Sequence, residues 1–133
     1  EINLEDKNSI VQTLEKIGVT KDYVLIWGTG EVYREFLYVD DLADACVFLM
    51  EKYDFKDIGE FVNIGTGKDA KIKEFAKIIR ETVGYEGEIR YDTSKPDGMP
   101  RKLLDITCLK GLGWQTRVSI EVGLREYYET YLL

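Results

Sequence analysis

Apolar runs along the chain are short and are separated by glycine-containing turns, a pattern that predicts a mixture of short strands and short helices. Tyr23–Trp27 (YVLIW) is rich in β-branched and aromatic residues and ends on a GTG turn at residues 28–30, which predicts a strand. Further extended segments are predicted at residues 34–39, 61–64 and 88–91. A second GTG turn, at residues 65–67, follows the segment 61–64.

Apolar residues at helical spacing predict helices between these segments. We expect one helix to run from Asp40 to about Lys52, with Asp40 and Asp41 supplying a capping oxygen and a favourable charge. Its predicted apolar stripe consists of Leu42, Ala45, Cys46 and Leu49. Another helix is predicted at residues 71–83, ended by Gly84, with one apolar side formed by Ile72, Phe75, Ala76, Ile79 and Val83.

Three shorter helices are predicted from capping residues. Ser9 is expected to cap a helix that Gly18 ends, with Ile10, Leu14 and Ile17 on one face. Asp105 is expected to cap a helix through Leu109 and Leu112, ended by Gly113 and covered by Trp114. Ser119 is expected to open a last helix, whose apolar and aromatic face is formed by Ile120, Leu124, Tyr127, Tyr128 and Tyr131.

Composition narrows the possible functions. A chain of 133 residues that is 44% hydrophobic and 32% charged fits one compact domain with a hydrophobic core. The net charge of −7 argues against nucleic acid or an anionic membrane as a partner, and no apolar run approaches the ~20 residues of a membrane span. Two distant cysteines fit a reducing compartment, so we expect a cytoplasmic protein. Because the chain has no histidine, histidine is not its acid, base or metal ligand, and we expect no metal site.

The most informative segment is KPDGMPRKLLD at residues 95–105. It places Lys95, Arg101 and Lys102 in a loop with one acid, Asp97, and two prolines and Gly98 exclude helix and inner strand. A loop that is stiff before ligand arrives binds a phosphate or carboxylate at little further entropic cost. Taken alone, the segment fits either an anion-binding loop or an ordinary solvated loop.

The run SKPDG, one variable residue and PRKLLD resembles the characteristic loop of the GDP-L-fucose synthases. These enzymes are NADPH-dependent 3,5-epimerase/4-reductases of the extended short-chain dehydrogenase/reductase family. WGTG at residues 27–30, REFLYVDDLADA at 34–45, NIGTG at 63–67 and LGW at 112–114 follow the order of that family. REFxYVDD and LGW are shared by many sugar-nucleotide reductases and epimerases, whereas the KPDG segment is more specific. The resemblance covers residues 23 to 133, and residues 1–22 carry no recognised motif.

The resemblance implies a fold and a role. We expect a small mixed α/β lobe, the C-terminal substrate-binding lobe of a Rossmann-type enzyme, at residues 23–133, preceded by a helical segment or insertion at residues 1–22. The family's NADPH-binding domain, its catalytic Tyr/Lys pair and its Cys and His are not identifiable in the chain. The fragment is therefore expected to have no catalytic or cofactor-binding residues and to be inactive and monomeric alone, although the complete family enzymes are usually homodimers.

Four residues match the family's substrate positions: Trp27, Arg34, Asp97 and Lys102. The implied ligand is a GDP-sugar, either GDP-4-keto-6-deoxy-D-mannose or GDP-L-fucose. Arg34 suits its pyrophosphate and Trp27 its sugar or nucleoside, while Asp97 can accept hydrogen bonds from ribose or guanine and Lys102 can serve phosphate or base. A surface ion pair of Arg34 with Asp40 or Glu35 and a core position for Trp27 remain open. Arg101 can bind ligand or support the loop.

Two further matches are interpreted as accidental. Residues 65–70 (GTGKDA) fit the dinucleotide fingerprint G-x-G-x-x-[GA], but the chain has too few strands for a doubly wound sheet. Tyr91 and Lys95 fit Y-x-x-x-K, but Pro96 moves Lys95 out of the helical geometry that such a pair needs. Two alternatives to a GDP-fucose synthase lobe remain: the lobe of another NAD-dependent sugar-nucleotide epimerase or dehydratase, and a non-catalytic binding module of the same fold.

Overall fold

The computed structural model describes residues 7–132, with side chains for all of these except residues 7–10, 13 and 131. Its contacts divide the chain into two compact units where composition predicts one domain. The first unit is formed by Glu1–Val32 and Ile72–Pro100, and the second by Tyr33–Lys71 and Arg101–Leu133. The KPDG segment is therefore divided after Pro100. Whether residues 1–22 are a separate segment stays a prediction.

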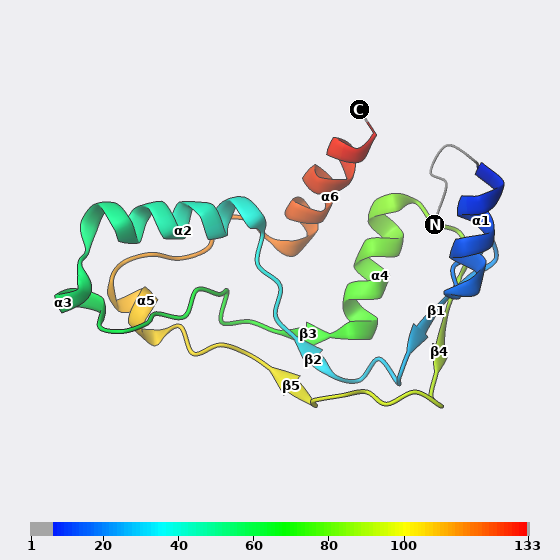
Figure 1. Cartoon of the computed structure of the whole chain (residues 1–133), viewed down its shortest axis with the longest axis horizontal. Coiled ribbons are helices and arrows are strands. Elements are labelled where there is room, and N and C mark those ends of the chain that lie inside the picture. The colour runs from blue at the N-terminus through cyan, green and yellow to red at the C-terminus, as the bar shows by residue number, and fades with distance from the viewer. Residues whose placement is uncertain (1–6, 133) are drawn as a thin grey trace. The chain divides into compact units, whose positions relative to one another are not determined.

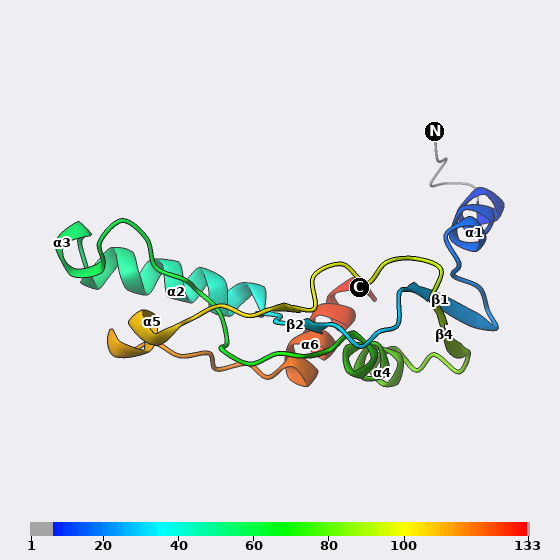
Figure 2. The same cartoon turned by 90° about the horizontal axis from the view of Figure 1, so that it is seen from below.

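The first unit contains α1 (Lys7–Lys16), β1 (Tyr23–Trp27), α4 (Ile72–Val83) and β4 (Glu88–Asp92). Strands β1 and β4 lie side by side in parallel, with register from Tyr23↔Glu88 to Trp27↔Asp92 (Figures 1 and 2). The predictions of β1, β4 and α4 are confirmed, although α4 begins one residue late. The capping role predicted for Ser9 is wrong, because α1 begins before it at Lys7 and so contains Ser9 in its first turn.

The second unit contains a three-stranded sheet of order β3-β2-β5, with β2 at Tyr33–Arg34, β3 at Ala70–Lys71 and β5 at Arg101–Lys102. Strand β2 is antiparallel to β3 and parallel to β5. Of the extended segment predicted at 34–39, only Arg34 belongs to a strand, Tyr38 is extended but unpaired, and Val39 already begins α2. The strand predicted at 61–64 is wrong. Val62 and Ile64 pack on the core, and the Asn63 side-chain amide donates to the Asp105 carbonyl at 3.1 Å, so packing and a side-chain contact replace strand pairing.

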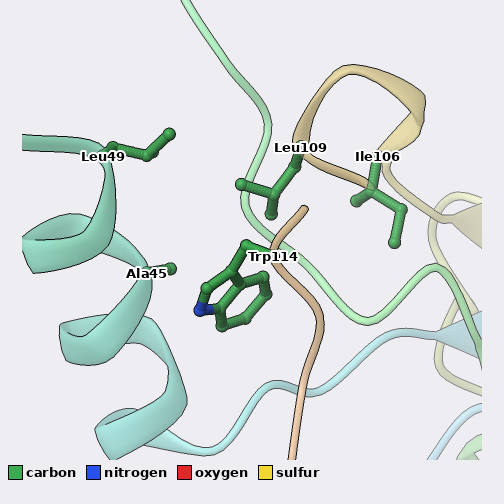
Figure 3. Packing of buried hydrophobic residues seen from close by; sticks show 5 residues of the cluster. All are labelled: Ala45, Leu49, Ile106, Leu109 and Trp114. Carbon is green, nitrogen blue, oxygen red and sulfur yellow. The ribbon is translucent and has the colours of Figure 1, made fainter. Parts of the chain in front are cut away.

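Four helices complete the part of the second unit that the structure describes: α2 (Val39–Lys52), α3 (Phe55–Ile58), α5 (Thr107–Gly111) and α6 (Ile120–Tyr131). The hydrophobic core of this unit is shown in Figure 3, where Ala45 and Leu49 project from α2 toward Trp114 and Leu109. Trp114 is 3% exposed, and its indole N–H donates to Asp44 at 2.8 Å, which satisfies its polar group. The covering role predicted for Trp114 is confirmed.

The predicted start of α2 is corrected. The helix begins at Val39, and its N-cap is Tyr38 with no side-chain cap, so Asp40 lies inside the first turn. Asp41 is 5% exposed and accepts hydrogen bonds from the Arg117 and Val118 amides, both at 3.0 Å. The Asp41 carboxylate therefore holds residues 117 and 118, which lead into α6, against α2, and it does not cap α2.

The remaining helix predictions are confirmed in part. Ser119 caps α6 by accepting from the Val122 amide at 3.4 Å. Asp105 accepts from the Thr107 amide at 2.9 Å, although the N-cap of α5 is Ile106. Leu42, Cys46 and Tyr127 are exposed and leave the predicted apolar faces narrower than expected, and the Tyr131 side chain lies outside the described residues. Within residues 7–132, no helix is both long and apolar enough to span a membrane.

Candidate functional site

Two of the four predicted site residues are neighbours in the sheet of the second unit. Arg34 pairs with Lys102 across the parallel strands β2 and β5. Residues paired in this way lie about 4.8 Å apart and project from the same face of a sheet. Arg34 is half-buried and its Nη1 donates to the Tyr33 carbonyl at 2.6 Å, whereas Lys102 is exposed. The fold therefore brings together two cations that are far apart in the sequence.

Arg101 has a supporting role in this sheet. Its guanidinium binds Asp69 through both carboxylate oxygens, with Nε–Oδ2 at 2.5 Å and Nη2–Oδ1 at 2.8 Å. The Asp69 side chain is only 5% exposed, and the hydrogen bond from Arg101 holds the pKa of Asp69 below its usual range. The guanidinium also lies 5.5 Å from the ring centre of Tyr33. Of the two roles left open for Arg101, these contacts favour support of the loop.

The sequence pointed to Glu35, the residue that follows Arg34, only as an ion-pair partner of Arg34 and gave no indication of its hydrogen bonds to other segments. Its Oε1 accepts hydrogen bonds from the Thr66 amide at 2.6 Å, the Gly67 amide at 2.6 Å and the Thr66 hydroxyl at 3.1 Å. Its Oε2 accepts from the Leu104 amide at 2.9 Å. The carboxylate thus joins the end of β2 to the second GTG turn and to the segment after β5. In the sequence, Glu35 is a carboxylate beside Arg34, and no local pattern indicates that it joins these segments.

In the first unit, the predicted site residue Asp97 holds the first GTG turn. Its Oδ1 accepts from the Thr29 amide at 2.7 Å, and its Oδ2 accepts from the Thr29 hydroxyl at 2.7 Å. The hydrogen bond from the Thr29 side chain, followed by that from its amide, lowers the pKa of Asp97. Gly28 has φ +85°, and a Cβ there would lie 2.3 Å from Asp97 Oδ1, so this close approach requires glycine.

Trp27, the fourth predicted residue, is 70% exposed at the end of β1, so it is not part of the core of this chain. The Lys95 ammonium lies 5.6 Å from the ring centre of Trp27. Lys95 is placed there by its amide, which donates to the Asp92 carbonyl at 3.1 Å. Trp27 and Asp97 thus belong to the first unit, and Arg34 and Lys102 to the second.

The two accidental matches lack the geometry that their motifs require. Residues 61–64, directly before the turn at 65–67, form no strand, and β3 lies between the turn and α4 in the chain. The Thr66 and Gly67 amides, which a dinucleotide pyrophosphate would need, donate to Glu35, so these residues do not fit NADPH. Tyr91 lies on β4 and Lys95 beyond a turn, so the pair has no helical spacing. A hollow of about 630 Å³ beside the end of α4 contains none of the four predicted site residues.

Comparison with known proteins gives the class first. The model of the NAD dependent epimerase/dehydratase family matches residues 3–65. A GDP-D-glycero-L-gluco-heptose synthase from Campylobacter jejuni, solved in the presence of NADPH, is 36% identical with a TM-score of 0.85 over 96% of this chain and 38% of that one. The chain is therefore homologous to NAD(P)-dependent epimerases and reductases and forms a mixed α/β portion of the extended short-chain dehydrogenase/reductase fold.

Within this class, the chain is a partial-length match to the GDP-L-fucose synthases. It is 51% identical over 111 residues to the putative GDP-L-fucose synthase 2 of Arabidopsis thaliana, covering 84% of this chain and 33% of that protein. The chain spans about a third of the length of the curated relatives it matches. Another similar structure is the GDP-mannoheptose C4 reductase MlghC of Campylobacter jejuni with NADP bound, at 40% identity and TM-score 0.79 over 89% of this chain and 37% of that one. The resemblance carried by the KPDG segment is confirmed.

Proposed function

We propose that the chain is the GDP-sugar-binding, C-terminal portion of a cytoplasmic GDP-L-fucose synthase. The whole enzyme would convert GDP-4-keto-6-deoxy-D-mannose to GDP-L-fucose by 3,5-epimerisation and NADPH-dependent 4-reduction. The observation that carries the proposal is the pairing of Arg34 with Lys102 on adjacent strands, in a chain with this degree of identity to GDP-L-fucose synthases. The Rossmann domain that binds NADPH and forms the homodimer would lie in the rest of the enzyme.

The Arg34–Lys102 pair suits a pyrophosphate. The planar guanidinium of Arg34 can bind two phosphate oxygens at once, while Lys102 supplies a compact charge beside it. A hydrogen bond to a charged group contributes about 1.5–3 kcal/mol, so the pair accounts for a large share of the affinity for a nucleoside diphosphate. Arg101, which precedes Lys102 on β5, is bound by Asp69 and is not assigned to the phosphate.

The family resemblance assigns Trp27 and Asp97, both in the first unit, to binding of a sugar and a nucleoside. The exposed Trp27 indole offers an apolar face against which a sugar or base ring packs. Asp97 accepts hydrogen bonds from Thr29, and each carboxylate oxygen retains capacity for a ribose hydroxyl. Contacts to the GDP part, remote from the reacting carbons, hold the keto sugar in place for chemistry performed by the rest of the enzyme.

A specific observation supports a second candidate. The two Campylobacter jejuni proteins are a GDP-mannoheptose C4 reductase and a GDP-D-glycero-L-gluco-heptose synthase, and their structures match 89% and 96% of the chain. The chain is then the equivalent portion of an enzyme for another GDP-sugar. Both candidates require the same guanosine diphosphate contacts and differ only in the sugar.

Chemical-shift titrations of the labelled chain test these proposals. We expect GDP-L-fucose and GDP to shift the resonances of Trp27, Arg34 and Lys102, and UDP-glucose and NADPH to leave them unchanged. Equal shifts with UDP-glucose would show no preference for GDP, and the chain would then belong to another sugar-nucleotide epimerase or dehydratase. A lack of response to every nucleotide at millimolar concentration would favour the non-catalytic binding module. Comparison of GDP-L-fucose with a GDP-heptose then separates the two GDP-sugar candidates.

A further inference from the structure

The carboxylate of Glu35 occupies an anion-binding arrangement of backbone amides. Successive N–H groups that point toward one place in a turn form a concave site for an anion. The Thr66 and Gly67 amides both donate to Glu35 Oε1 at 2.6 Å. Gly65 has no Cβ, and a Cβ there would lie 2.6 Å from the same oxygen. The turn is therefore shaped around this internal carboxylate.

Glu35 also binds the chain beyond β5. Its Oε2 accepts from the Leu104 amide at 2.9 Å, two residues after Lys102. Strands β2 and β5 contain two residues each, which is shorter than strands that hold their own register. Hydrogen bonds to a carboxylate are about twice as strong as neutral ones. A single side chain on the residue after Arg34 therefore fixes the strand that carries Lys102.

The second GTG turn is itself anchored to the core. Gly67 has φ +68°, and a Cβ at this position would lie 2.7 Å from Cδ1 of Ile106, a member of the buried cluster. Asn63 donates to the Asp105 carbonyl at 3.1 Å, which fixes the same loop to the start of α5. Through the Glu35 carboxylate, β2 and the segment after β5 are held in a fixed position relative to the core.

We propose that Glu35 is a positioning residue that sets Arg34 and Lys102 at the separation required for a diphosphate. Glu35 does not touch the ligand and acts through the backbone of both strands. The identity of the ligand depends on the proposed function, whereas the positioning role of Glu35 depends only on its hydrogen bonds. The two claims can therefore fail separately.

Amide hydrogen exchange tests the positioning. Glu35→Gln keeps the shape of the side chain, but its amide has one acceptor oxygen and places an NH2 group against an amide donor. We expect hydrogen exchange to accelerate at least tenfold at one or more of the Leu104, Thr66 and Gly67 amides, while the amides of α2 keep their exchange rates. Glu60→Gln removes the same charge from an exposed position of the same unit and should change none of these rates. Unchanged exchange in Glu35→Gln, or equal acceleration throughout α2, would overturn the positioning role.

A double-mutant cycle tests the link to the ligand, with GDP as the probe. Glu35→Gln should weaken GDP binding at least tenfold in the wild-type background and less than threefold when Lys102 is already alanine, because the separation of the two cations matters only while both are present. Equal, additive losses would show that Glu35 acts only on general stability and would overturn the proposal. If the wild-type chain binds no GDP, the proposed function fails and the exchange experiment still decides the role of Glu35.

Discussion

The two GTG turns of this chain are held by the same device to different extents. In the first unit, Asp97 accepts hydrogen bonds from the amide and hydroxyl of Thr29. In the second unit, Glu35 accepts from the equivalent groups of Thr66, and also from the Gly67 and Leu104 amides. Asp97 thus joins its own loop to one turn, whereas Glu35 joins its strand to two other segments. The same tripeptide, GTG, is therefore held by contacts with one loop in the first unit. In the second unit it is held by a carboxylate that also binds the segment after β5.

The largest expected effect is that of Glu35→Ala. The change leaves the Thr66, Gly67 and Leu104 amides without their carboxylate partner, and we expect a loss of about 2–3 kcal/mol in the free energy of unfolding. Urea unfolding followed by circular dichroism measures this loss. If Glu35→Ala lost less stability than Asp97→Ala, Asp97 and not Glu35 would be the more important of the two carboxylates.

Gly28→Ala should come next. A Cβ at this position, which has φ +85°, would lie 2.3 Å from Asp97 Oδ1, so alanine combines backbone strain with a clash. We expect a cost of about 1–3 kcal/mol in stability. Gly59→Ala is the matched control, because Gly59 also has positive φ but has no atom within 4 Å of a Cβ. If both variants lose the same stability, strain alone explains the effect and the close approach of Asp97 contributes nothing.

Thr66→Val and Thr29→Val compare the two hydroxyls. The Thr29 hydroxyl donates to Asp97, whereas the Thr66 hydroxyl shares its proton between Glu35 at 3.1 Å and the Lys68 carbonyl at 2.9 Å. Either change should cost about 1 kcal/mol. Thr29→Val should also raise the pKa of Asp97, because the Thr29 side chain is the first cause of its lowering. Carbon-detected titration of the Asp97 carboxyl reads this directly, and an unchanged pKa would contradict the clamp.

The smallest expected effect is the pH dependence of the Asp97 clamp. The pKa of Asp97 is lower in the folded protein than its ordinary value, so the folded state binds the proton less tightly than the unfolded state does. This contribution is present above the unfolded pKa of about 3.9 and is lost as pH falls through the folded pKa. The difference in unfolding midpoint between wild type and Asp97→Asn should therefore shrink below pH 4. A difference that is constant with pH would contradict this assignment.

Local patterns predict more of the fold than of the site. The β-branched and aromatic run Tyr23–Trp27, the periodicity of α4 and the cap at Ser119 depend on neighbouring residues and are confirmed. Residues 61–64 failed as a strand because side-chain packing on the core fixes them without a pairing partner. Asp40 failed as a cap because the helix begins one residue before it.

For the site, the sequence pointed to Arg34 and Lys102 as separate residues through resemblance, but not to their pairing. That pairing depends on the parallel register of β2 and β5, which no local pattern encodes. The joining role of Glu35 was missed for the same reason: its hydrogen-bond donors come from residues 66, 67 and 104. Long-range contacts of this kind become visible only in the folded chain.

The central claim is that the Arg34–Lys102 pair binds a guanosine diphosphate, and the affinity of Arg34→Ala for GDP tests it most directly. The loss of one charged, bidentate contact predicts at least a tenfold weaker Kd, on the order of 1.4 kcal/mol or more, by titration calorimetry. Lys56→Ala, which removes a positive charge from exposed α3, should bind GDP as the wild type does. Equal GDP affinity of Arg34→Ala and the wild type would contradict the account.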